Sequence, residues 1–354
     1  MYQRLVLRIL VLVILLAGSL SAFAQTITIF DVPGSTDTQP LAINSKGQIT
    51  GSYVDALGKH GFLRQPDGTL ISFDAPLNGR VQTIPTSMNT AGEIAGYVFS
   101  LDTFLDYAFA RGKDGSFVIF DEPDACRSQR MLGSVNQATW GPLQAIGRVE
   151  GIAATGISNR GDITGICGPA PPFNRSFLRQ RNGQVAVFSV PVKGPSITLA
   201  QAINCHGQIA GSFYDAGENG AYLGFLRQSD GTISTFGHPY SDVRPVALTS
   251  AGWIIGTADG HGFVLRSGGR LGIFDVANSV STQPNAISSA GRIAGAYLDA
   301  ANAYHGFIRE LDGEITVFDV PGSTSTYPVG MDSRGDVAGW YSDASGIHGF
   351  IRSE

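Results

Sequence analysis

The sequence predicts an all-β fold, a seven-bladed β-propeller built from four-stranded antiparallel blades. A nine-residue phrase, Ile43 to Gly51 in its first copy, recurs in variant form seven times. Two other landmarks also recur seven times: a Phe after a small residue, and an aromatic residue at a strand end. A tight hairpin turn between them recurs six times. A fixed period is typical of repeat architectures, in which each copy is one supersecondary unit.

The spacing of the copies supports a unit of about one blade. The first glycine of the phrase falls at positions 47, 92, 161, 207, 252, 291 and 335. The second and third copies stand 69 residues apart, and the other neighbours stand 39 to 46 residues apart. Such a period suits four short strands with tight turns, and the 46 glycines, together with abundant Val, Ile, Thr and Phe, favour the same fold.

The strands of the first repeat can be placed in order. β-branched and alternating segments predict strands, and the dipeptide Asp67-Gly68 predicts a two-residue hairpin. The expected strands are Thr26 to Phe30, Pro40 to Ile43, Gln48 to Val54, Gly61 to Gln65 and Leu70 to Phe73.

The two ends of the chain predict a closed ring. The chain begins with a strand of the fourth type, Thr26 to Phe30, and ends after a strand of the third type, Gly349 to Arg352. These leftover strands complete one blade if the array closes. An open solenoid would expose strand edges at both ends and would need capping repeats, so closure is favoured.

The first 24 residues are expected to be a cleaved signal peptide. Arg4 and Arg8 precede an apolar run, and Ala22-Phe23-Ala24 fits a small-x-small cleavage site. The alternative is a membrane anchor, which the short run disfavours. Residues 25–354 are then a single seven-repeat domain. It is expected to be secreted or periplasmic, without a membrane span after cleavage, and a monomer.

Charge and cysteine content narrow the function classes. The net charge is −5 and no basic stripe is present, so a nucleic-acid partner is not expected. Of the three cysteines, Cys126 and Cys167 flank the longest irregular stretch. They could form a disulfide in an oxidising compartment, but spacing alone does not fix the geometry.

The predicted ring brings repeated aspartates and histidines to one face of the disc, around the mouth of the central channel. The candidate ligand-binding residues there are Asp55, His60, Asp299, His305, Asp343 and His348. Four of the six histidines precede Gly-Phe. They could be metal or acid/base groups, but equivalent positions on successive blades diverge, so loop residues bonded to the adjacent blade's backbone are favoured. The carboxylates leave Ca²⁺ or Mg²⁺ open as a cofactor, although the loop Asp55 to His60 lacks a calcium-hand pattern.

The segment Glu122 to Gly156 breaks the repeat and is expected to be an enlarged loop on the same face. It carries three further candidate ligand residues, Arg127, Arg130 and Trp140. Long loops are often functional, so this one could clamp a glycan or peptide, or it could be a surface excursion. Both readings stay open.

Seven arginines recur at the end of the third strand, and they are expected to form ion pairs or to pack within their own blade. In the fifth copy Arg266 comes one residue late, which suggests a bulge.

The order Ile-Asn-x-x-Gly-x-Ile-x-Gly, then His-x-Phe, then Asp-Gly resembles the HAF-repeat extracellular proteins of bacteria. The His-x-Phe element reads His60-Gly61-Phe62, His305-Gly306-Phe307 and His348-Gly349-Phe350, with Gly where that family has Ala. The resemblance implies a secreted bacterial protein and transfers no catalytic residue. A second likeness, to the streptogramin lyase type of propeller, rests on the rhythm of strand, Pro and Gly, and implies a divalent metal and an acid/base His.

The sequence therefore favours a secreted binding or scaffold protein that recognises an extracellular glycan, peptide or protein at the channel mouth, with no catalysis assigned. The alternative is a metal-dependent propeller lyase or hydrolase acting on a polysaccharide or a small cyclic substrate. No nucleophile elbow, zinc-protease helix or phosphate loop is present.

Overall fold

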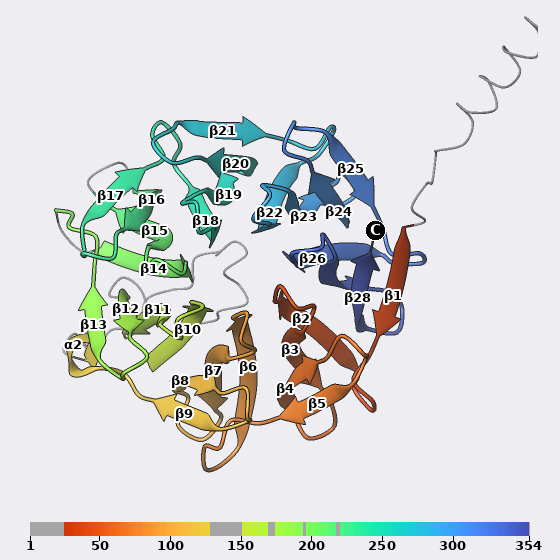
Figure 1. Cartoon of the computed structure of the whole chain (residues 1–354), viewed down its shortest axis with the longest axis horizontal. Helices are drawn as coiled ribbons and strands as arrows, with labels where there is room; N and C mark the ends of the chain where they lie inside the picture. Colours follow the sequence, from red (N-terminus) through yellow and green to blue (C-terminus); the bar gives the residue numbers. More distant parts are fainter. Residues whose placement is uncertain (1–24, 128–150, 169–173, 194–195, 217–219, 354) are drawn as a thin grey trace, which may run out of the picture.

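In the computed structural model, the strands of the chain are arranged in sheets around a central axis (Figure 1). It describes residues 25–127, 151–168, 174–193, 196–216 and 220–353. The expected signal peptide lies outside the described residues. No helix in the described part of the chain is long and apolar enough to cross a membrane.

The described strands form seven four-stranded antiparallel blades, numbered here in chain order. Blade 1 contains β2 (Asp37–Ile43), β3 (Ile49–Val54), β4 (Lys59–Arg64) and β5 (Leu70–Phe73). Blade 2 contains β6 (Val81–Met88), β7 (Ile94–Ser100), β8 (Asp106–Arg111) and β9 (Phe117–Phe120). Blade 3 contains β10 (Gly151–Ile157), β11 (Ile163–Gly168), β12 (Arg175–Arg179) and β13 (Val185–Phe188). Blade 4 contains β14 (Ser196–Ile203), β15 (Ile209–Asp215), β16 (Ala221–Arg227) and β17 (Ile233–Phe236).

The remaining blades follow the same order. Blade 5 contains β18 (Val243–Leu248), β19 (Ile254–Ala258), β20 (His261–Leu265) and β21 (Leu271–Phe274). Blade 6 contains β22 (Ser281–Ile287), β23 (Ile293–Leu298), β24 (Tyr304–Arg309) and β25 (Ile315–Phe318). Blade 7 contains β26 (Ser325–Met331), β27 (Val337–Ser342), β28 (Ile347–Ser353) and β1 (Thr26–Phe30).

The predicted closure of the ring is confirmed. Strand β1 pairs antiparallel with β28 along its whole length, from Thr26 opposite Ser353 to Phe30 opposite Gly349. The turns between the first and second strands of blades 7 and 1 also meet. There, Ser333 Oγ donates to the Ser45 carbonyl at 3.0 Å and joins the last blade to the first. The last blade is thus completed by the first strand of the chain, as a closed ring requires and an open solenoid does not.

The second glycine of the recurring phrase is explained by a bulge in each innermost strand. All seven first strands shift register at the same point, between Pro40 and Ala42 in blade 1. The bulge presses the backbone of β2 against Gly51, where an added Cβ would lie 2.1 Å from the Gln39 carbonyl oxygen. Only glycine tolerates that approach, which is why the phrase always ends in Gly.

The core lies between blades. A Phe in the third strand of every blade is fully buried, and each packs against residues of the preceding blade. These residues are Phe62, Phe109, Phe177, Phe225, Phe263, Phe307 and Phe350. Burying one such ring stabilises the fold by about 2–3 kcal/mol, so the repeated Phe binds the blades into one unit.

Several strand boundaries differ from the sequence prediction, as in β2, which starts at Asp37 and not at Pro40, and two of the differences affect site residues. Strand β4 starts at Lys59, so His60 lies in the strand opposite Tyr53 and not in a loop. Strand β10 starts at Gly151, so the end of the segment expected to be loop is the first strand of blade 3. In both places cross-strand pairing extends further than the alternation of residue types indicated.

Candidate functional site

The predicted Asp and His residues form small clusters that repeat from blade to blade. In blade 1, His60 Nδ1 lies 2.9 Å from Asp74 Oδ2, and its Nε2 lies within 3.2 Å of Asp55 Oδ1. The imidazole also packs on Tyr53, with ring centroids 5.2 Å apart. His60 therefore ties the end of the fourth strand to the loop between the second and third strands.

Blades 6 and 7 repeat this arrangement. His305 lies 2.9 Å from Asp319 and 3.3 Å from Asp299. His348 lies 2.9 Å from Asp31 and 3.3 Å from Asp343. Both rings pack on a tyrosine of the second strand. Asp31 follows β1, so the blade 7 cluster also joins the two ends of the chain.

The clusters do not converge on one site. Each belongs to a single blade, and each involves third- and fourth-strand residues, which Figure 1 shows away from the axis. The sequence placed these residues at the channel mouth, and the structure instead places them in the outer half of the blades. The adjacent blade's backbone is not the partner either, because the histidines bond carboxylates of their own blade. Among the described residues, no group of three or more His, Cys, Asp or Glu is arranged to hold a metal ion.

Protonation of two of these histidines is coupled to their carboxylates. Burial alone would lower the pKa of both histidines. For His305, hydrogen bonds and charges from Asp319 and Asp299 outweigh burial and raise its pKa above 6.5. For His348, Asp31 and Asp343 have the same effect. The pKa of Asp299 is lowered, and the largest cause is the hydrogen bond that the Ala303 backbone N–H donates to its carboxylate.

A pH-dependent stability follows from these shifts. A histidine whose pKa is raised in the folded state stabilises the fold. This contribution is complete at pH values below the histidine pKa in the unfolded chain, about 6.5, and it is lost as the pH rises through the pKa in the folded protein. The lowered aspartate pKa adds stability that is lost as pH falls below about 4. We expect the double variant His305→Gln/His348→Gln to melt further below the wild type at pH 5.5 than at pH 8.5. An equal difference at both pH values would contradict the coupling, and His206→Gln, an exposed histidine, is the control.

The disulfide that the sequence left open is present between Cys126 and Cys167, with an S–S distance of 2.03 Å. It attaches the short helix α2 (Asp124–Arg127) to β11. Figure 1 shows α2 at the periphery of the disc, so Arg127 lies at the end of a helix away from the axis. Arg130 and Trp140 lie outside the described residues.

The recurring arginines join neighbouring blades. The guanidinium of Arg64 lies over the ring of Phe30, which belongs to blade 7, and Arg111 lies over Phe73 of blade 1. The guanidinium of Arg64 also donates to the Gln65 carbonyl of its own blade at 3.2 Å. The prediction of interactions within one blade is therefore incomplete, because it missed the contact with the neighbouring blade. Six blade junctions carry this pair at 4.8 to 5.1 Å, formed by Arg64, Arg111, Arg179, Arg227, Arg309 and Arg352.

The junction between blades 4 and 5 lacks the pair. Leu265 pairs with Ile254 and Leu271, as Arg64 pairs with Ile49 and Leu70, so Leu265 occupies the arginine position. The bulge expected before Arg266 is absent from this ladder. Arg266 instead lies over Trp253 of its own blade, 4.8 Å from the ring centroid.

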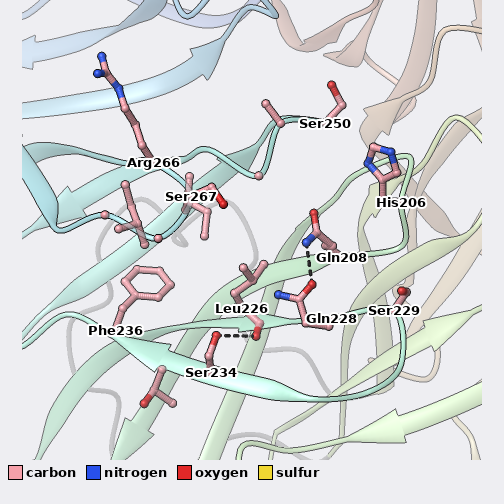
Figure 2. A pocket seen from close by; sticks show the side chains of 17 residues that line it. His206, Gln208, Leu226, Gln228, Ser229, Ser234, Phe236, Ser250, Arg266 and Ser267 are labelled. Atoms are coloured by element: carbon pink, nitrogen blue, oxygen red, sulfur yellow. Dashed lines mark hydrogen bonds between the residues drawn. The ribbon is translucent and has the colours of Figure 1, made fainter.

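A cleft of about 540 Å³ lies at this same junction. Figure 2 shows Phe236 on one side of it, with His206 and Ser250 on the other, and Arg266 directed away. Leu226 and Leu265 add apolar surface. The polar lining consists of His206, Gln208, Gln228, Ser229, Ser234, Thr235, Ser250, Arg266 and Ser267. The cleft is on the face of the first-to-second and third-to-fourth turns, opposite the Asp/His clusters. The sequence analysis did not predict this cleft. The late position of Arg266 in the fifth repeat was the one irregularity in the sequence that pointed to this junction.

Comparison with known proteins identifies the fold class and not a family. No family model matches the chain, and no curated protein matches it. Among solved structures it is similar to virginiamycin B lyase from Staphylococcus aureus in a complex with quinupristin, at 14% identity and a TM-score of 0.57. That match covers 93% of this chain and 100% of the lyase chain. The chain also spans about half of two peptidases, both at a TM-score of 0.54. They are acylaminoacyl peptidase from Pyrococcus horikoshii, at 10% identity, and prolyl oligopeptidase B from Galerina marginata, at 9%.

These likenesses establish a β-propeller. The fold-level likeness to the lyase-type propeller, noted in the sequence, is supported. Membership of the HAF-repeat proteins stays a prediction, since no family model matches.

Proposed function

We propose that this protein is a secreted propeller that binds an extracellular ligand, a glycan or peptide, in the cleft between blades 4 and 5. One observation carries the proposal: six of the seven junctions are closed by an arginine over a Phe ring, and the cleft lies at the one that is not. A concave site with a few polar groups around an apolar floor is typical of a ligand site.

Two features support the extracellular setting of the proposal. The first 24 residues have the composition of a signal peptide. The Cys126–Cys167 disulfide is of a kind that persists in oxidising compartments. The channel mouth remains a second candidate surface for the same role.

A metal-dependent lyase is the second candidate function, favoured by the fold likeness to virginiamycin B lyase. Fold alone does not carry activity over, since a propeller hosts many functions. Stoichiometric Ca²⁺ or Mg²⁺ in protein dialysed after purification, with conversion of quinupristin detected by mass spectrometry, would favour this candidate over a binding protein.

The binding proposal is tested by incubating the protein with glycan and peptide arrays beside the variant Leu265→Arg. We expect the new arginine to lie over Phe236, as the repeat's arginines do at the other junctions, and so to block that part of the cleft. We expect the wild type to bind members of one array and the variant to lose that binding. Equal binding by both proteins would place the site elsewhere.

A further inference from the structure

The blade 4–5 cleft differs from a closed junction at the position of the recurring arginine, and this difference indicates what it holds. At the junction of blades 1 and 2, Gln48 Nε2 donates to Gln65 Oε1 at 2.9 Å, and Arg111 covers Phe73. At the junction of blades 4 and 5, Gln208 Nε2 donates to Gln228 Oε1 at 2.7 Å in the same way (Figure 2). Here Leu265 takes the place of the arginine, and the face of Phe236 is left to a ligand.

The charge of the lining argues against a cation in that place. At the other junctions a guanidinium lies over the Phe ring, so an arginine or lysine side chain of a bound peptide is the obvious substitute at Phe236. However, none of the 17 described lining residues is Asp or Glu, whereas Arg266 and His206 both line the cleft. A cation would lose hydration and meet a like charge instead of a counter-ion, which disfavours it.

The remaining groups suit a ring that carries hydroxyls. The face of Phe236 offers a flat apolar surface, edge-on to the buried Phe263 at a centroid distance of 6.3 Å. Side-chain amides and hydroxyls surround it, and these both donate and accept hydrogen bonds. The Gln228 side-chain NH₂ makes no hydrogen bond within the described residues, so it can donate to a ligand.

On these grounds we infer that the cleft binds a saccharide. One sugar ring stacks its C–H face on Phe236, while its hydroxyls bond Gln228, Gln208 and the serines of the rim. This rests on the proposed binding function and deepens it by naming the ligand class. Loss of the flat aromatic face removes this stacked contact, so it weakens binding about 2- to 10-fold.

The experiment uses the best ligand from a glycan array, titrated calorimetrically into four proteins: the wild type, Leu265→Arg, Phe236→Leu and Leu311→Arg. Phe236→Leu keeps an apolar side chain but removes the flat ring. Leu311→Arg is the matched control, because Leu311 is half exposed on a hairpin of blade 6 and gains the same charge outside the cleft.

We expect Leu265→Arg to weaken binding at least 10-fold, Phe236→Leu to weaken it several-fold, and Leu311→Arg to stay within 2-fold of the wild type. Sugar binding that Leu265→Arg leaves unchanged would overturn this site. A blank glycan array, with peptide binding that Leu265→Arg abolishes, would overturn the saccharide and leave the proposed function standing. If neither array shows binding, both the saccharide and the proposed function fail.

Discussion

Removal of strand β1, Thr26–Phe30, is expected to destabilise the entire propeller and not only its end. The strand forms the outer edge of blade 7, and Phe30 lies under Arg64 of blade 1. Its loss exposes the edge of β28 and breaks a junction on the other side of the seam. Removal of a fully buried Phe side chain costs about 3–5 kcal/mol of unfolding free energy. Phe30 is only partly buried, but loss of β1 also removes the ladder hydrogen bonds to β28 and the cation–π contact with Arg64. The total loss therefore reaches that range or exceeds it.

The measurement is thermal unfolding of a chain that begins at Asp31, compared with one that begins at Gln25. We expect a fall in melting temperature of about 10 °C or failure to fold, given about 2–4 °C per kcal/mol for proteins of 150–250 residues. Thr28→Pro in the centre of β1 should act in the same direction, because proline removes a ladder donor. Ile29→Thr is the control, since Ile29 is 59% exposed. Unchanged melting of the truncated chain would contradict closure by β1.

The variant Cys126→Ala/Cys167→Ala is expected to lose about 4 kcal/mol of unfolding free energy. The bridge spans 41 residues of sequence, and closing a loop of that length removes this much conformational freedom from the unfolded chain. Alanine avoids placing an unpaired hydroxyl in the core where Cys126 and Cys167 are buried.

Denaturant unfolding under oxidising conditions measures the change. Cys205→Ala is the matched control, because Cys205 is free and only partly buried. We expect it to unfold at nearly the same denaturant concentration as the wild type. A double variant as stable as this control would show that the disulfide contributes nothing to the fold.

The repeat made the fold predictable from the sequence. Each landmark has a physical cause that acts in every blade: the glycine admits the bulged first strand, and the third-strand Phe fills the space between blades. The counts of seven, seven and six also predicted where the chain ends meet, and β1 pairs with β28 there.

The candidate site was less predictable, because it depends on which neighbour each side chain meets. Whether Arg64 turns toward its own blade or toward Phe30 depends on the stacking of blades, which spacing along the chain does not encode. His60 was assigned to a loop because its pairing with Tyr53 extends beyond the visible alternation. Arg266 was read as a displaced arginine, whereas alignment by strand register identifies Leu265 as the substituted residue.

Leu265 stands where the other six junctions have an arginine, and this equivalence underlies both the cleft and its proposed ligand. Calorimetric unfolding of Leu265→Arg and Arg227→Leu, without any ligand, tests it directly. Arg227 lies over Phe188 and donates to the Gln228 carbonyl at 3.2 Å, so Arg227→Leu should lower the unfolding free energy by about 1–3 kcal/mol. Leu265→Arg should keep or raise it, because the new guanidinium finds Phe236 in place. If Leu265→Arg lowers stability as much as Arg227→Leu does, the two positions are not equivalent and the claim fails.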